Sequence, residues 1–185
     1  MSILNYHNFY NGGGVAIGDI NNDGKPDIFF TSNQGDNKLY LNKGNLQFED
    51  ITAKAKISSK HKWHTGVTMI DINGDGWLDI YVCNAGIMAG DDRANELYIN
   101  QKNGTFTEEA HAYGLDDKGA STQAIFFDYD RDGYLDCFVL NNSPRSIANF
   151  GYAKKAREVR DPVNGDRLYR NNNGKFTDVS IDAGI

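Results

Sequence analysis

The chain has 185 residues, of which 39% are apolar and 12% aromatic, and it carries a formal charge of −6. This length can bury a substantial core, but no stretch approaches the roughly 18 continuous apolar residues that a membrane-spanning helix needs. Ten of the 25 acidic residues fall in three short loops and the other fifteen stand against nineteen lysines and arginines, so the basic face typical of nucleic-acid-binding proteins is not apparent.

The first seven residues do not have the basic and apolar character of a secretory leader, so no signal peptide is expected within this sequence. Cys83 and Cys137 each lie in an apolar run. Two such residues cannot make a disulfide framework, and we expect both to be small buried hydrophobic residues.

Three similar units follow one another, over residues 12–57, 64–115 and 121–185. In chain order each unit contains an apolar run, a loop rich in Asp and Asn, a second apolar run, a Leu-Tyr pair and a phenylalanine. Each closes on Ile or Leu nine residues after that phenylalanine, and the loops begin 52 and then 57 residues apart. The third unit is lengthened by an insertion at 142–165, within which residues 147–160 are predicted to form a short helix.

The residue pattern of each unit predicts four short strands. The two apolar runs are rich in Val, Ile, Phe and Tyr and nearly continuous in hydrophobicity, as expected of strands covered on both faces. The first strands are predicted at 15–18, 67–70 and 124–127, and the second at 28–31, 80–83 and 137–140. The third strand contains the Leu-Tyr pair and the fourth begins near the phenylalanine. Asn- and Gly-containing turns at 42–44, 103–104 and 173–174 are typical of the hairpins between them.

Repeated four-stranded antiparallel units of this size favour an all-β fold made of β-propeller blades. A solenoid is the competing interpretation, but solenoid repeats are usually shorter and would not supply four strands each. Propellers close with about four to eight blades. Three blades therefore predict a partial propeller, completed either by further blades of a longer chain or by association of chains into a homo-oligomer.

The three loops share one pattern of metal-binding residues. Counted from the first Asp, positions 1, 3, 5 and 9 carry Asp or Asn, position 6 is always Gly, and position 7 is expected to contribute its backbone carbonyl. The predicted ligands are Asp19, Asn21, Asp23, Lys25 and Asp27; Asp71, Asn73, Asp75, Trp77 and Asp79; and Asp128, Asp130, Asp132, Tyr134 and Asp136.

Hard oxygen ligands at alternating positions, wrapped around one point by a glycine bend, are typical of Ca²⁺. An EF-hand is excluded because position 12 carries Phe30, Val82 or Val139 in place of a bidentate Glu, and because the flanks are β-rich. Mg²⁺ prefers compact octahedral sites and Zn²⁺ prefers sulfur and nitrogen ligands. The sequence thus predicts about three calcium ions, one per unit, which tie the first strand to the second.

These residues resemble the FG-GAP/VCBS repeats of integrin-α-like propellers. More narrowly, the segment Tyr10–Asp19, the Phe-x-Asp-x-Thr segment at 48–52 and the ending 182–185 are similar to bacterial surface proteins that carry an ASPIC/UnbV domain. The resemblance implies a propeller fold, calcium in the loops, a location outside the cytoplasm (extracellular, cell-surface or periplasmic), and binding of a protein or glycan partner. Family members typically have about seven blades, so the resemblance also implies further blades.

Other motifs have simpler interpretations. Residues 61–64 (His-Lys-Trp-His) are predicted to form a solvated loop, Gly12–Gly14 a flexible lead into the first strand, and the basic stretch 154–160 a solvated face. The Tyr and Phe that recur once per unit are expected to pack. We find no arrangement of residues typical of an active site, so we expect a non-enzymatic recognition scaffold. A lectin or part of a polysaccharide-active enzyme, and a self-assembling structural propeller, are the alternatives.

Overall fold

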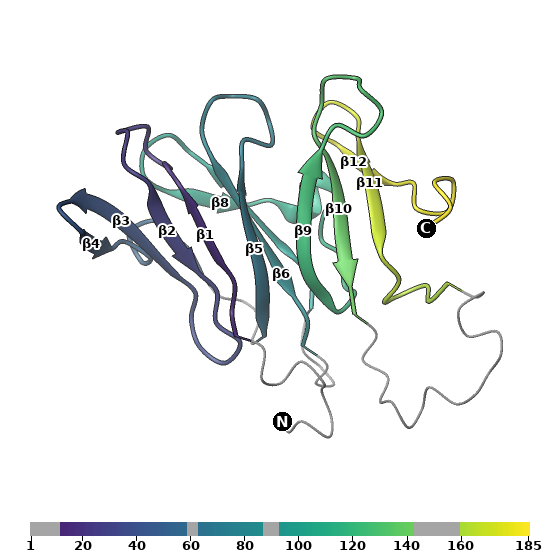
Figure 1. The fold of residues 1–185 in the computed structure, drawn as a ribbon, viewed down its shortest axis with the longest axis horizontal. Coiled ribbons are helices and arrows are strands. Elements are labelled where there is room, and N and C mark those ends of the chain that lie inside the picture. The colour runs from purple at the N-terminus through teal and green to yellow at the C-terminus, as the bar shows by residue number, and fades with distance from the viewer. Residues whose placement is uncertain (1–11, 59–62, 87–92, 143–159) are drawn as a thin grey trace.

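The computed structural model describes residues 12–58, 63–86, 93–142 and 160–185. Their strands form three four-stranded antiparallel sheets, each a meander of consecutive strands (Figure 1). The first sheet contains β1 (Val15–Gly18), β2 (Asp27–Phe30), β3 (Lys38–Gly44) and β4 (Gln47–Asp50). The second contains β5 (His64–Ile70), β6 (Asp79–Asn84), β7 (Glu96–Asn100) and β8 (Phe106–Glu108). The third contains β9 (Ser121–Phe127), β10 (Asp136–Asn141), β11 (Arg167–Asn171) and β12 (Phe176–Asp178).

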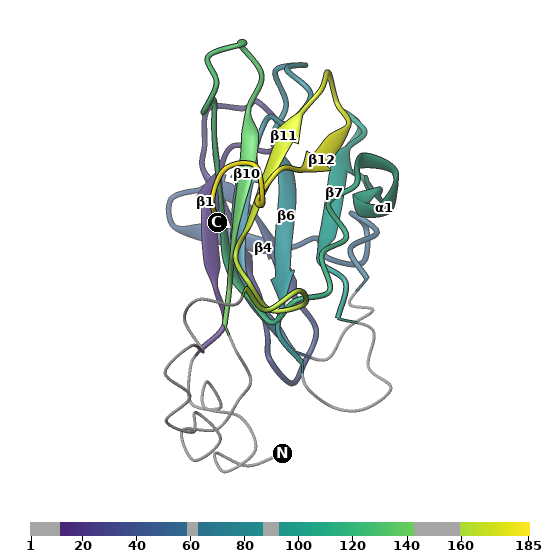
Figure 2. The ribbon, with the colours of Figure 1, turned by 90° about the vertical axis from the view of Figure 1, so that its right-hand side faces the viewer.

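The predicted all-β class is confirmed, with one addition. A single-turn helix, α1 (Ala110–Tyr113), follows β8 and packs beside β7 (Figure 2). It ends at Gly114, whose φ of 79° is a left-handed C-cap conformation that glycine adopts without strain. No helix among the described residues is long and apolar enough to cross a membrane. The predicted helix at 147–160 lies, except for Arg160, outside the described residues.

The three sheets stack face to face. Successive residues of a strand point to opposite sides, so the middle sheet presents apolar side chains to both of its neighbours. In β6, Ile80 and Val82 face the first sheet and join a core with Phe29 and Leu39. The alternate β6 residues, Tyr81 and Cys83, belong to a second core with the third sheet. That second core also contains Cys137, so both cysteines are buried, as predicted.

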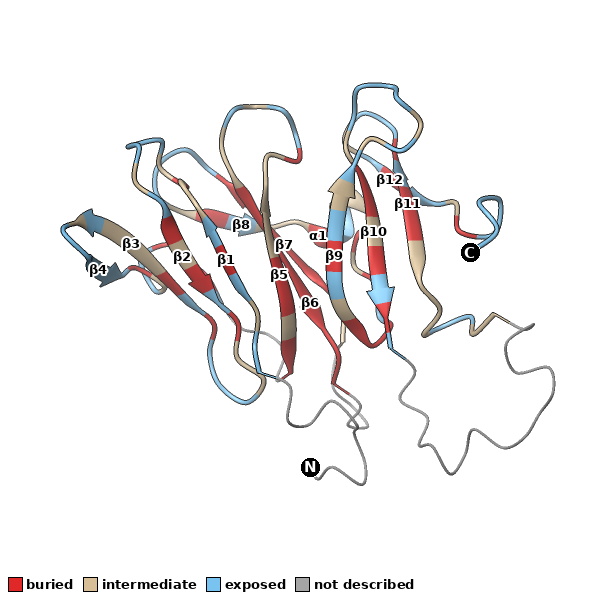
Figure 3. Cartoon of the chain, in the orientation of Figure 1, coloured by how far each residue is buried: buried red, intermediate tan, exposed pale blue. Residues whose placement is uncertain are grey.

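Among the residues that the structure describes, only the middle sheet has both faces covered, which corrects the expectation that the first two strands of every unit are covered on both faces. Every residue of β6 is buried. In β1, by contrast, Val15 and Ile17 are 55% and 65% exposed, and in β9 Ile125 is 53% exposed. Figure 3 shows the difference between the red middle sheet and the mixed colouring of the outer two. The covering of a strand depends on the neighbouring sheet, which the strand's own residues cannot specify.

The same difference in coverage explains how deeply the recurring aromatic residues are buried. Phe106, Phe176 and Tyr98 are buried, as packing residues should be. Phe48, at the equivalent position of the first sheet, is 40% exposed because it lies on the uncovered face.

The hairpin between β3 and β4 turns later than predicted. Gly44 pairs with Gln47, so the two-residue turn is Asn45-Leu46, with φ values of 53° and 58°. This left-handed pair matches the twist of the strands. In the third sheet the turn lies at Asn173-Gly174, as predicted.

Candidate metal centres

The three loops extend from the same end of their sheets, each joining the first strand to the second (Figure 1). The aspartate at position 1 closes each loop. In the first, Asp19 accepts the backbone N–H groups of Asp23 and Gly24 at 3.1 and 2.7 Å. The corresponding distances are 3.0 and 2.9 Å in the second loop and 3.1 and 3.0 Å in the third. Glycine is required at position 6, since its φ is 82°, 85° or 92°.

Positions 3, 5 and 7 continue this inward curl. The Asn73 side-chain oxygen accepts the N–H of Asp75 at 3.0 Å, and the Asp75 carboxylate accepts that of Trp77 at 2.9 Å. Lys25 and Tyr134 donate in the same way to the position-5 carboxylates of their loops, both at 2.9 Å. The backbone at position 7 therefore lies against the loop carboxylates. Coordination through its carbonyl stays a prediction.

The third loop brings carboxylates closest together. Within the part of the chain that the structure describes, Asp128, Asp130 and Asp136 each present an oxygen, and these oxygens lie within 4.8 Å of one another. The Oδ1 atom of Asp130 is buried without a hydrogen-bond partner. Converging carboxylates with a buried, unsatisfied oxygen suit a cation, because the cation offsets both their mutual repulsion and their loss of solvation. The residues present therefore fit a hard divalent ion.

Each loop also attracts one basic side chain. Lys25 Nζ lies 3.1 Å from Asp23, Lys102 Nζ lies 3.2 Å from Asp75, and Arg170 Nε lies 2.9 Å from Asp130. All three cationic side chains are about half exposed. Exposed pairs of this kind contribute only about 0 to 1 kcal/mol, so a divalent ion can displace them.

The aspartate at position 9 has a second role that the sequence analysis missed. Asp27, Asp79 and Asp136 are fully buried. One oxygen of each accepts the N–H of loop position 2, at 3.0, 3.2 and 3.0 Å. The other accepts the N–H of the asparagine near or at the end of the third strand, at 2.8 Å in every sheet. Burial raises the pKa of Asp79 to about 6 and also raises that of Asp27. A bound cation would favour the charged form instead.

The FG-GAP-like repeat family matches residues 8–82 and 87–139. The chain belongs to this family. This family agrees with the resemblance seen in the sequence. The first match contains the first and second loops, and the second match contains the third loop.

Three curated relatives that the chain matches are all named cartilage acidic protein 1. The chain is 31% identical to the protein of Xenopus tropicalis over 157 residues, which is 84% of this chain and 24% of the relative. It is 33% identical to the Mus musculus protein over 156 residues, 82% of this chain and 23% of the relative. It is 34% identical to the Homo sapiens protein over 135 residues, which is 69% of this chain and 20% of the relative. The chain thus spans about a quarter of these relatives.

An asparagine holds each FG-GAP-like loop to the third strand of its sheet. The side chains of Asn42, Asn100 and Asn171 donate to the carbonyl of loop position 8, at 2.9, 3.1 and 3.0 Å. Their side-chain oxygens accept an N–H from the following turn, at 2.8, 2.9 and 2.7 Å. These residues recur once per repeat at a fixed distance from the Leu-Tyr pair, and that recurrence is the sequence signal that could have found them.

The expectation for residues 61–64 is wrong at His64. Its ring is fully buried in β5, Nδ1 lies 2.9 Å from the carbonyl oxygen of Ser32, which follows β2 of the first sheet, and Nε2 lies 3.4 Å from the Glu96 carboxylate. β5 begins three residues before the predicted strand and carries the histidine into the core. His61 lies outside the described residues, as does the basic stretch 154–160 apart from Arg160.

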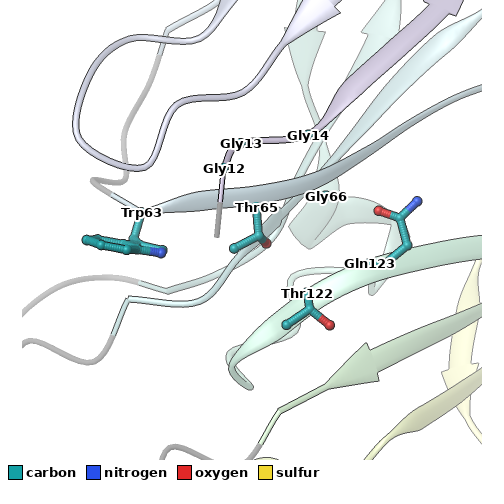
Figure 4. Close-up of a pocket in the computed structure, with 8 residues that line it drawn as sticks. All are labelled: Gly12, Gly13, Gly14, Trp63, Thr65, Gly66, Thr122 and Gln123. Carbon is teal, nitrogen blue, oxygen red and sulfur yellow. The ribbon is translucent and has the colours of Figure 1, made fainter. Parts of the chain in front are cut away.

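The glycines before β1 and within β5 allow close packing of neighbouring segments. A Cβ on Gly13 would lie 2.0 Å from the carbonyl oxygen of Thr31, and one on Gly66 would lie 1.9 Å from Gln123 Oε1. With Trp63, Thr65 and Thr122 they surround a cavity of about 230 Å³ where the first strands converge (Figure 4). Gly13 and Gly14 therefore let neighbouring backbones approach, a more specific role than the flexible lead that was predicted.

Proposed function

We propose that this chain is a calcium-binding segment of an extracellular β-propeller that serves as a recognition scaffold. The observation that carries the proposal is the repeated loop of alternating Asp and Asn residues at the same end of each sheet, together with the convergence of the Asp128, Asp130 and Asp136 oxygens in the third loop. About three Ca²⁺ ions would be held by positions 1, 3, 5, 7 and 9. Calcium would supply charge neutralisation there, and it would tie the first strand of each sheet to the second.

A propeller is supported by how the sheets stack. The middle sheet uses one face against the first sheet and the opposite face against the third, so each outer sheet has an open face suited to another neighbour. The exposed Val15, Ile17 and Phe30 on one side, and Ile125 and Leu140 on the other, mark those faces. We propose that further sheets of a longer protein cover them. Assembly of several copies is the second candidate, and the same open faces favour it.

A location outside the cytoplasm follows from the calcium proposal. Extracellular calcium modules work with dissociation constants of about 10⁻⁴ to 10⁻³ M, and loops as exposed as these suit that range. The relatives' name, which refers to cartilage, agrees with such a location. We propose recognition of a protein or glycan rather than catalysis, because the carboxylate sets that recur in the chain are those of the loops.

Metal content of the purified, folded chain tests the proposal. Elemental analysis after dialysis against calcium should find about three ions, and Asp23→Ala, Asp75→Ala and Asp132→Ala should each remove one. Light scattering on the same sample separates the two ways of covering the open faces: a folded monomer excludes self-assembly. The calcium proposal would be overturned if the folded chain contained no metal and its melting temperature did not change when EDTA was added.

A further inference from the structure

The first and second metal loops are joined by side-chain contacts. The Asn22 amide, at position 4 of the first loop, donates to the carbonyl oxygen of Gly76 in the second loop at 3.0 Å. From the second sheet, the Asn100 amide donates to the carbonyl oxygen of Ile20 at 2.8 Å. These two hydrogen bonds cross between neighbouring sheets and connect the first loop to the second sheet.

The second loop has no side chain at position 4 that could contact the third loop as Asn22 contacts the second. Position 4 of the second loop is Gly74, which has a φ of 71° and open space around it. The Asn171 amide, equivalent to Asn100, donates to Leu135 within its own sheet. A groove of about 730 Å³ lies between these loops. It is lined by Asp71, Ile72, Asn73, Gly74, Tyr113, Gly133, Tyr134, Leu135, Asn173 and Gly174.

The lining combines aromatic rings with amide and hydroxyl groups. Tyr134 is 44% exposed. Tyr113 follows the second sheet in α1 and lines the groove together with Asn73. Each tyrosine offers an apolar ring with a polar tip, and Asn73 and Asn173 offer amide groups. Pockets of about 300 to 1,000 Å³ with apolar walls and a few placed polar groups are typical ligand sites.

The charge of the groove selects among ligands. None of the described residues that line it is Lys, Arg or His, and its one charged side chain, Asp71, already accepts two backbone N–H groups. A phosphate, sulfate or carboxylate group would find no cationic side chain among these lining residues. A ligand that matches the lining has apolar C–H faces for the rings and many neutral hydroxyl groups for the amides and phenols.

From this lining we infer that the groove between the second and third loops binds a neutral saccharide. Gly74 leaves the groove open, and Tyr134 and Tyr113 contact the apolar face of a sugar ring. The NH2 group of Asn73, whose side-chain oxygen faces its own loop, and the amide of Asn173 hydrogen-bond to the sugar hydroxyls. The inference rests on the proposed recognition function and specifies its partner. The first and second loops, which Asn22 connects, provide the internal comparison.

The experiment uses the full chain with calcium and a panel of neutral oligosaccharides built from hexoses, deoxyhexoses and N-acetylhexosamines. Saturation-transfer NMR identifies a bound sugar, and calorimetric titration measures its affinity. Gly74→Asn copies position 4 of the first loop, where Asn22 has a φ of 56°, so the new side chain should enter the groove and lower the affinity at least tenfold. Tyr134→Ala should produce a similar loss.

Gly104→Asn is the matched control. Gly104 has a φ of 80° and open space, as Gly74 does, but it does not line the groove, so saccharide affinity should be unchanged. The inference is overturned if no neutral sugar of the panel binds, if only a sulfated polysaccharide binds, or if binding survives both Gly74→Asn and Tyr134→Ala. Metal analysis of the same samples keeps the two proposals apart. Three ions without sugar binding overturn only the groove, and Gly74-dependent sugar binding without metal overturns only the calcium.

Discussion

The Oδ1 atom of Asp79 accepts the backbone N–H of Asn100 at 2.8 Å, joining the start of β6 to the end of β7. The same relationship recurs in the other two sheets, between Asp27 and Asn42 and between Asp136 and Asn171. The last aspartate of each loop is therefore a structural residue even before a metal is considered. Its two roles can be separated by experiment.

We expect Asp79→Ala to destabilise the chain with or without calcium. In EDTA it leaves two buried N–H groups, those of Ile72 and Asn100, without their acceptor, at a cost of about 2 to 4 kcal/mol in the free energy of unfolding. Asp75→Ala removes a partly exposed carboxylate and should cost less than about 1 kcal/mol in EDTA. Urea unfolding in EDTA and in calcium measures both. Equal losses for the two variants in EDTA would contradict the structural role of Asp79.

Arg170→Ala should strengthen calcium binding at the third loop. Arg170 Nε lies 2.9 Å from Asp130, one of the predicted ligands, so calcium must displace it. An exposed pair contributes up to about 1 kcal/mol, which predicts an affinity gain of up to about fivefold. Calorimetric titration of a chain whose other two loops carry Asp23→Ala and Asp75→Ala isolates this site. A weaker third site after the substitution would show that Arg170 supports the ligands instead of competing.

His64 should be essential for stability although it lies in a segment predicted to be solvated. His64→Ala removes the contact with Ser32 that joins two sheets and takes away one partner of the buried Glu96 carboxylate. A loss of about 1 to 3 kcal/mol is typical when a buried polar group loses a hydrogen-bonding partner. His111 also contacts a carboxylate, Asp116 at 3.0 Å, but its side chain is 93% exposed, so His111→Ala should cost less than about 1 kcal/mol. Thermal unfolding of both variants compares the two positions.

Lowering the pH should reduce the stability of the chain, because it protonates Asp50 at the end of the first sheet. Hydrogen bonds from Thr52, together with Lys38, lower the pKa of Asp50 to about 2. Because this folded-state pKa lies below the ordinary value of 3.8, the stabilisation is present above about pH 4 and is lost as the pH falls toward 2. Asp50→Asn should therefore be less stable than the parent chain at pH 6 and approach it near pH 2.5, as measured by urea unfolding across that range. A difference independent of pH would rule out a charge effect.

Asp50 also illustrates how one local task is solved in two ways. Its carboxylate accepts the Thr52 hydroxyl at 2.6 Å, and that hydroxyl in turn accepts the N–H of Leu39 in β3. In the second sheet Glu108 replaces the aspartate, and its longer side chain reaches the N–H of Leu97 directly at 3.4 Å. The Phe-x-Asp-x-Thr signature was visible in the sequence, but the relay that it forms was not.

The sequence by itself determined the repeats, the four strands of each sheet and the three loops. These features depend on residues close together in the chain: a short apolar run rich in Val, Ile, Phe and Tyr sets a strand, and Gly24 or its equivalent sets the bend of a loop. Such local preferences do not require knowledge of what lies opposite. The strand bounds accordingly agree with the structure to within a few residues.

Only the tertiary structure decided which of these surfaces are covered. Val15 and Val67 occupy the same repeat position, yet Val15 is 55% exposed and Val67 is 5% exposed, because only β5 has a sheet against that face. The burial of His64 and the groove beside Gly74 arise in the same way, from contacts between residues far apart in sequence. Burial and pocket shape are properties of two packed surfaces, and a repeat pattern describes only one of them at a time.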